Sequence, residues 1–213
     1  MMKQTILLVC AILLCSGAAF GGMISEDPGE LSVSGQYWFP GDGDFDLFNS
    51  GYGLSASYRE WFSFPCGVGV NLGVDQWQVD EGSNALKYDN LVDYKGDVLL
   101  IPIGASMYFN LIDWDNWNLI LEGGLQYVFV DSSFSVFNKE PSINRREDVD
   151  IGGALLGNLG ADYEYMISEN VYLLAGAGYQ FNVVKADTSY GTYDVRDTSF
   201  AGAFVRLGAK FLF

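Results

Sequence analysis

The 213-residue sequence contains no histidine, and this absence excludes several kinds of chemistry at once. Hydrolysis by a Ser-His-Asp triad needs an imidazole as general base, and imidazole is also a common ligand of zinc. Two carboxylates alone can hydrolyse glycosides, but no pair of acids marks a recognisable cleft here. We therefore expect no enzymatic activity, no cofactor and no metal centre.

Basic residues and cysteines are also scarce. Eleven Lys and Arg stand against 27 Asp and Glu, and the net charge of -16 argues against binding to nucleic acid. Two of the three cysteines, Cys10 and Cys15, lie within the first 19 residues, which form the secretory signal. Only Cys66 then remains in the mature chain, so no intramolecular disulfide is expected.

The N-terminus has the three parts of a secretory signal. Lys3 supplies the positive charge, residues 6–14 are apolar, and small residues at 17–19 offer a cleavage site. The apolar stretch is much shorter than the ~20 residues of a membrane-spanning helix. We predict a signal peptide over 1–19, with cleavage as late as residue 21 as the alternative. A short periplasmic lead over 23–30 and a single domain over 31–213 follow.

No long apolar run follows the signal, but short segments alternate between apolar and polar residues. In the last segment Val205, Leu207, Ala209, Phe211 and Phe213 share one face. A period of two indicates a β-strand. The same alternation predicts eight strands, at residues 31–39, 52–61, 67–77, 98–110, 117–130, 151–165, 171–182 and 198–213. Each has at least the ~9–11 residues with which a tilted strand crosses a bilayer.

The predicted connections alternate in length. Those at 62–66, 111–116 and 166–170 are short, whereas those at 78–97 and 131–150 are long. Short periplasmic turns and longer outer loops are typical of membrane β-barrels, the only sheets that satisfy their backbone inside a bilayer. An even number of strands places both termini of the chain on the same, periplasmic side.

The two faces of the predicted strands differ in chemistry. One is rich in Leu, Val, Ile, Ala and aromatic residues, and the other in Ser, Asn, Gln, Gly and charged residues. Aromatic residues gather at both ends of the apolar face, as at two membrane interfaces. Near the short connections they are Trp61, Phe62, Phe64, Phe109, Trp114, Trp117, Tyr163, Tyr165, Phe211 and Phe213. Near the long connections they are Tyr37, Phe39, Tyr52, Tyr127, Phe129, Tyr179 and Phe181. A soluble lipocalin would need the opposite arrangement, with its apolar face inside.

With its eight alternating segments and its terminal Phe213, the chain resembles the small eight-stranded outer-membrane β-barrels of the OmpA and OmpX-like family. The resemblance covers nearly all of the mature chain and rests on topology, not on a long motif. It implies an all-β fold, an eight-stranded antiparallel up-and-down transmembrane β-barrel, in the outer membrane of a diderm bacterium. It also implies contact with outer-membrane lipid and lipopolysaccharide. The assembly signal read by the barrel-assembly machinery would be Val205, Leu207, Phe211 and Phe213.

Six charged residues fall on the inward face, near the short connections: Arg59, Glu122, Asp162, Glu164, Arg206 and Lys210. Three bases and three acids in a narrow interior are expected to pair, because unpaired buried charges are costly. Asp75 lies nearer the long connections. We predict a closed lumen plugged by salt bridges. The alternative is a narrow pore that uses these residues as a selectivity ring.

The outer loops supply a second candidate site. Asp42, Asp44 and Asp46 alternate like the first ligands of a calcium loop, but the later ligands and the closing Glu are missing. The sequence thus predicts a structural or surface-interacting outer-membrane barrel with an unidentified extracellular ligand. A small porin for ions or solutes is the alternative, and a periplasmic lipocalin-like binder is a third.

Overall fold

The computed structural model describes residues 29–41, 48–79, 92–138, 146–190 and 193–213. The predicted signal peptide and the candidate cation-binding residues Asp42, Asp44 and Asp46 lie outside these ranges, as does the predicted lead up to residue 28. No helix in the described part of the chain is long and apolar enough to span a membrane.

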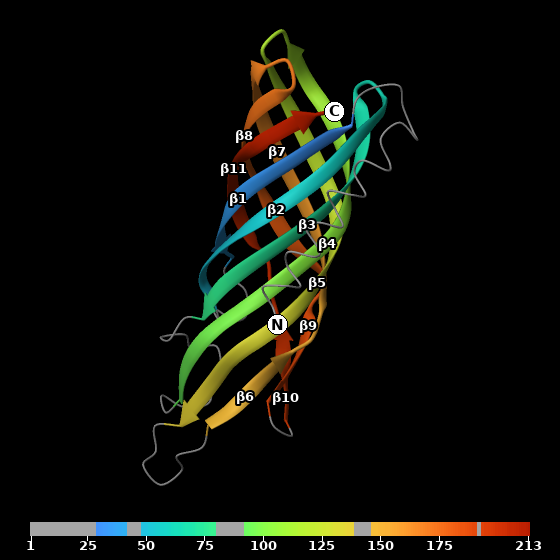
Figure 1. Cartoon of the computed structure of the whole chain (residues 1–213). Coiled ribbons are helices and arrows are strands. Elements are labelled where there is room, and N and C mark those ends of the chain that lie inside the picture. Colours follow the sequence, from blue (N-terminus) through green and yellow to red (C-terminus); the bar gives the residue numbers. More distant parts are fainter. Residues whose placement is uncertain (1–28, 42–47, 80–91, 139–145, 191–192) are drawn as a thin grey trace.

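Eight strands close into an antiparallel barrel, which confirms the predicted fold class (Figure 1). They are β1 (Glu30–Pro40), β2 (Phe48–Ser63), β3 (Cys66–Val79), β4 (Val92–Trp114), β5 (Trp117–Asn138), β7 (Ala154–Ser168), β8 (Val171–Val184) and β11 (Gly202–Leu212). Each strand pairs with the next along the chain, and β1 pairs with β11 to close the barrel. The first strand begins at Glu30, one residue before its predicted start.

Two ends of the barrel can be distinguished. At the short-turn end, two-residue connections at 64–65, 115–116 and 169–170 join successive strands, and these turns are tighter than predicted. At the opposite, loop end, β4 and β5 continue as one ladder from Val92–Asn138 to Trp114–Trp117. Three short strands extend the sheet there: β6 (Arg146–Ile151), β9 (Ala186–Tyr190) and β10 (Tyr193–Thr198).

These extensions correct part of the sequence prediction. Residues 131–138 and 92–97, expected in long loops, are strand, because the β4–β5 pairing runs on without a break. Conversely, the predicted strands at 151–165 and 198–213 are interrupted. Residues 152–153 and 199–201 leave the ladder, and the Gly152 N–H donates instead to the Asp187 carbonyl at 2.8 Å.

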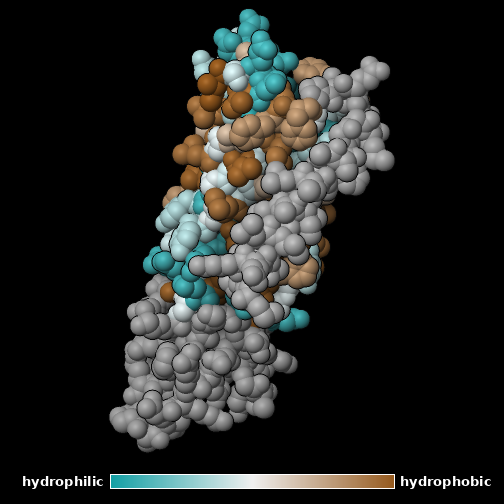
Figure 2. Space-filling view, viewed as in Figure 1, coloured by the Kyte–Doolittle hydropathy of each residue, from teal (hydrophilic) through white to brown (hydrophobic). Residues whose placement is uncertain are grey.

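The alternation of side chains follows the predicted faces. Highly exposed aliphatic and thioether side chains, such as Leu207 (71%), Leu54 (67%) and Met107 (65%), lie on the outer wall. Figure 2 shows apolar side chains gathered on this wall, with hydrophilic side chains at the short-turn tip. Fifteen of the seventeen predicted belt aromatics are exposed. Trp61 and Trp117 are half-buried, and Trp61 faces the lumen beside Arg59.

Inward glycines make room for large inward side chains on the neighbouring strand. Gly51 pairs with Trp77, and Gly53 pairs with Asp75. A Cβ at Gly51 would lie 2.4 Å from the Trp77 ring, and a Cβ at Gly53 would lie 1.9 Å from the Asp75 carboxylate. Neither glycine could become alanine without moving these side chains. An eight-stranded barrel has an interior that side chains just fill, and this pairing of small with large residues lets them fill it.

Candidate functional site

The strand register divides the lumen into two halves. Across β1 and β2 the inward pairs run from Glu30–Arg59 at the short-turn end through Ser32–Ser57 and Ser34–Ser55 to Trp38–Gly51 toward the loops. The charged half therefore lies at the short-turn end, and an apolar half lies at the loop end.

Four charged side chains form the layer nearest the short-turn end, which we call the quartet: Glu30, Arg59, Glu164 and Lys210. The Arg59 Nη2 lies 2.8 Å from the Glu164 carboxylate and also contacts that of Glu30. The Lys210 Nζ lies 3.2 Å from Glu30 and contacts Glu164. All four are buried. Every charge therefore has two partners of opposite sign.

Aromatic rings pack on the two bases of the quartet. The Arg59 guanidinium lies 4.9 Å from the ring centre of Trp61 and 5.0 Å from that of Tyr108. The Lys210 Nζ lies 4.2 Å from the ring centre of Tyr172. At these distances each ring face attracts the cation. The aromatic rings thus add to the ion pairs in holding the two bases.

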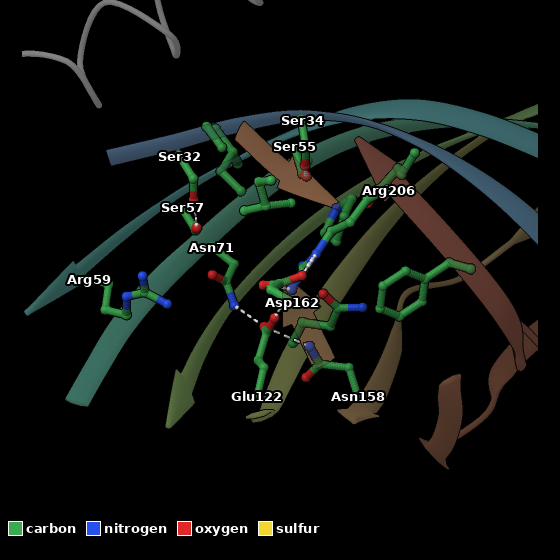
Figure 3. Close-up of a pocket in the computed structure, with 18 of the residues that line it drawn as sticks. Ser32, Ser34, Ser55, Ser57, Arg59, Asn71, Glu122, Asn158, Asp162 and Arg206 are labelled. Atoms are coloured by element: carbon green, nitrogen blue, oxygen red, sulfur yellow. Dashed lines mark hydrogen bonds and ion pairs between the residues drawn. The ribbon is translucent and has the colours of Figure 1, made fainter. Parts of the chain in front are cut away.

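A second cluster, the triad, lies one step toward the loops and consists of Arg206, Asp162 and Glu122. The Arg206 Nε and Nη2 donate to the two oxygens of Asp162 at 2.7 and 2.5 Å, and Nη2 also donates to Glu122. The other carboxylate oxygen of Glu122, Oε1, accepts from Ser106 Oγ at 2.8 Å and from Asn158 Nδ2 at 3.0 Å. Both carboxylates are therefore bound by several donors (Figure 3).

The structure brings all six charged residues of the sequence-based site together, in these two clusters. Arg59, Glu164 and Lys210 lie in the quartet, and Arg206, Glu122 and Asp162 in the triad. The sequence reasoning missed Glu30, because it ended the lead at residue 30. Glu30 continues the inward alternation of Ser32 and Ser34 by one step, and this pattern could have identified it.

Asp75 lies apart from both clusters. It is 2% exposed, and its carboxylate accepts from the Gln36 Nε2 at 2.5 Å. In the described part of the chain no basic side chain forms an ion pair with it. Asp75 is thus a buried acid that is held by the Gln36 amide and lies beside the indole of Trp38.

A cavity of about 50 Å³ lies in the charged half. One wall carries the hydroxyl pairs Ser32–Ser57 (2.6 Å) and Ser34–Ser55 (2.8 Å). The triad lies on the other side of the cavity (Figure 3). Its volume corresponds to a few water molecules. The structure therefore holds a small polar pocket and no wide channel in the part of the lumen that it describes.

The apolar half is closed by five rings, which we call the aromatic plug: Trp38, Phe48, Trp77, Phe200 and Phe204. All five are at most 8% exposed. Ring centres lie 4.9 Å apart for Trp38–Phe204, 5.5 Å for Phe48–Phe200 and 5.9 Å for Trp77–Phe200. Buried aliphatic residues surround the rings. The sequence-based prediction of a polar lumen is therefore wrong for this half.

Phe200 reaches the plug from a segment outside the ladder. Its N–H donates to the Asn182 side chain at 3.0 Å, and its carbonyl accepts from Gln180 Nε2 at 2.7 Å. These two side chains on β8 replace the strand hydrogen bonds that residues 199–201 lack. The chain thereby turns one ring inward at the loop end.

The residues of the predicted assembly signal lie on the outer wall of β11 or directly after it. Val205, Leu207, Phe211 and Phe213 are all exposed, from 42% to 71%. The Phe213 N–H donates to the Gly29 carbonyl at 3.1 Å, and its ring stacks on Tyr58. The last residue is therefore held against the first strand pair.

Comparison with solved structures identifies the fold. OprG from Pseudomonas aeruginosa aligns with 88% of this chain and 96% of its own, at 14% identity and a TM-score of 0.61. The outer membrane protein W of E. coli aligns with 90% of this chain and 100% of its own, at 11% identity and a TM-score of 0.53. Neisserial surface protein A aligns with 87% of this chain over 97% of its own length, at 13% identity and a TM-score of 0.52. No protein-family model and no curated protein matches the sequence.

Proposed function

We propose that this chain, which has the fold of the small outer-membrane β-barrels, is an integral outer-membrane protein with a closed lumen and no enzymatic activity. It acts through its lipid-facing wall and its loop end. The observation that carries this proposal is the filling of the lumen. Ion pairs occupy one half and the aromatic plug occupies the other, while apolar side chains face outward.

The outer wall supports lipid as the principal partner. Apolar side chains exposed in the middle of the wall lie between two sets of exposed aromatics, as expected for contact with a bilayer. The short turns fit the periplasmic side and the longer connections fit the outside. In this orientation, lipopolysaccharide contacts the loop-end belt. The exposed face of Val205, Leu207, Phe211 and Phe213 supports recognition by the barrel-assembly machinery during insertion.

The absence of histidine and the state of the buried acids support a non-enzymatic role. Glu122 and Asp162 both bind Arg206, and Glu122 also accepts from Ser106 and Asn158. Carboxylates held in this way are not free to act as general acid or base. The loop end, where β6, β9 and β10 extend the sheet beyond the barrel, is the better candidate for contact with an extracellular ligand.

Two measurements on one preparation test the proposal. The native protein should sediment with the outer membrane and migrate faster on gels before boiling than after it. Release by osmotic shock would support the lipocalin-like alternative instead. Liposomes containing the folded protein should not swell in small sugars or amino acids. Rapid swelling would favour the small porin and contradict the closed lumen.

A further inference from the structure

A groove runs along the outward face of β1. Leu31, Val33, Gly35 and Tyr37 form its floor, and side chains of the neighbouring strands form its sides. We call it the wall groove, and its volume is about 780 Å³. The strands β11, β1, β2 and β3 that carry it lie side by side in the barrel wall (Figure 1). The wall groove therefore belongs to the apolar outer wall and not to the lumen.

The middle of the wall groove is open because residue 35 has no side chain. Gly35 pairs with Leu207 on one side and with Leu54 on the other, and both leucines are highly exposed. A Cβ at Gly35 would meet nothing within 4 Å. At Gly123, another outward glycine, a Cβ would lie 3.3 Å from the Leu159 side chain. The space above Gly35 is thus left empty by its neighbours, whereas that above Gly123 is partly filled.

The length of the wall groove matches one leaflet of a bilayer. The six residue steps from Leu31 to Tyr37, at about 3.3 Å each, give about 20 Å along the strand. A strand tilted by about 45° then covers about 14 Å of depth, which is close to half of the ~30 Å hydrocarbon core. A single extended acyl chain of one leaflet therefore fits this length.

The loop end of the wall groove is polar. The Tyr52 hydroxyl donates to Gln76 Oε1 at 3.0 Å, and Gln76 Nε2 donates to an Asp97 carboxylate oxygen at 2.9 Å. Tyr52 and Gln76 line the groove, and Asp97 lies diagonally across from Gln76 on β4. We call these three side chains the polar row. Asp97 ends the row as an exposed carboxylate, which can only accept hydrogen bonds.

The polar row selects for a ligand with hydrogen-bond donors. Among the described residues that line the wall groove the one basic side chain is Arg206, and its guanidinium faces the lumen and binds Asp162 and Glu122. A phosphate at this end would face the Asp97 carboxylate without a counter-charge. An N–H or O–H group can instead donate to Asp97.

We propose that the wall groove binds one acyl chain of a lipopolysaccharide molecule, with the amide or hydroxyl group at the root of the chain donating to Asp97. The acyl chains of lipopolysaccharide include amide-linked, hydroxylated ones, whereas the ester-linked chains of phospholipids offer no donor at that depth. The inference rests on the proposed function, because the loop end must face the outer leaflet.

Apolar contact alone would not select this lipid. All lipid tails are as apolar as the wall, so preference among them must come from close packing and hydrogen bonds. The open space above Gly35 supplies the packing, and the polar row supplies the hydrogen bonds. The two features lie in one groove, which is why they act on the same molecule.

The proposal is tested by counting the lipid molecules bound to the purified, folded barrel in detergent with native mass spectrometry. Lipid A, the lipid part of lipopolysaccharide, is compared at equal concentration with phosphatidylethanolamine and phosphatidylglycerol. We expect lipid A to stay bound at a concentration at which neither phospholipid is retained. Equal binding of the three lipids would overturn the proposal and would indicate a non-specific shell of lipid.

Three variants locate the site. Gly35→Leu fills the open space and should lower the affinity for lipid A on the order of tenfold, because the chain loses contact with the floor. Ala105→Leu adds the same bulk to an exposed position of the outer wall outside the groove, and should bind lipid A as the parent does. Unchanged affinity in Gly35→Leu would contradict the groove.

Asp97→Asn tests the polar row. Since Asp97 is exposed, this variant should fold even if Gly35→Leu does not. It removes the charged acceptor and should reduce the preference for lipid A over phosphatidylethanolamine, and a full preference would contradict the role of Asp97. A barrel that sediments with the outer membrane but binds all three lipids equally would overturn only this inference. Release by osmotic shock would overturn the proposed function itself.

Discussion

The two halves of the lumen are filled on different principles. In the charged half each charged side chain is stabilised by specific ion-pair partners, as Arg206 is by Asp162 and Glu122. In the apolar half the rings of the aromatic plug are held by close packing: Trp77 lies over Gly51, and Phe200 stacks on Phe48. Loss of one member should therefore leave an unpaired charge in the first half and an empty volume in the second. The difference predicts how each half responds to mutation.

The largest effect is expected for Arg206→Ala. This change leaves the buried carboxylates of Asp162 and Glu122 without their cation. Breaking a buried ion pair from one side costs about 3–5 kcal/mol. Urea unfolding in detergent, followed by the shift between folded and unfolded bands on gels, measures the loss. An unchanged midpoint would show that the triad does not hold the barrel together.

A triple variant of the triad tests whether unpaired charge causes the loss of stability in Arg206→Ala. Adding Asp162→Asn and Glu122→Gln to Arg206→Ala removes the unpaired charges together with the base. We expect this triple variant to be more stable than Arg206→Ala alone, because neutral amides cost less to bury than carboxylates. A triple variant less stable than Arg206→Ala would mean that packing, and not charge, governs this half.

In the apolar half, Phe200→Ala should destabilise the barrel by about 3 kcal/mol, at the lower end for the loss of a buried ring. The lower end applies because residues 199–201 lie outside the ladder and can relax into the space. Phe200→Leu keeps most of the volume and should cost less than about 1.5 kcal/mol. The unfolding midpoints of both variants check this order, and equal losses would contradict filling by shape.

The smallest effect is expected at the hydroxyl pair of Ser34 and Ser55 on the cavity wall. Ser55→Ala removes a partly buried hydroxyl that pairs with Ser34, and one such hydrogen bond contributes about 1 kcal/mol. The exposed Asp131→Asn is the surface control and should stay within about 0.5 kcal/mol of the parent. A loss at Ser55 as large as that at Arg206 would contradict the view that ion pairs, more than neutral hydrogen bonds, hold the charged half together.

The period of two in the sequence was sufficient to predict the barrel and the outward face. It also placed Arg59, Glu164 and Lys210 on one inward face, because alternation alone determines which side of a strand a residue occupies. The predicted fold was confirmed. The prediction was strong because the same two-residue alternation occurred in eight segments and not in one.

The contents of the lumen were harder to predict. Trp38 and Trp77 alternate inward as regularly as Ser34, but one sequence gives no direct measure of which inward residues meet across the barrel. Which inward side chains meet depends on the register of strands that are far apart in the chain. The plug also needs Phe200, which leaves its strand, and no alternation marks such a break. Glu30 was missed at a strand boundary, where alternation has too few residues to be recognised.

The closed lumen is tested most directly by recording current through the purified, folded protein in planar lipid bilayers. The packing of the quartet, the triad and the aromatic plug predicts a flat baseline at moderate voltage. Steady openings of uniform conductance in the unmodified protein would contradict it.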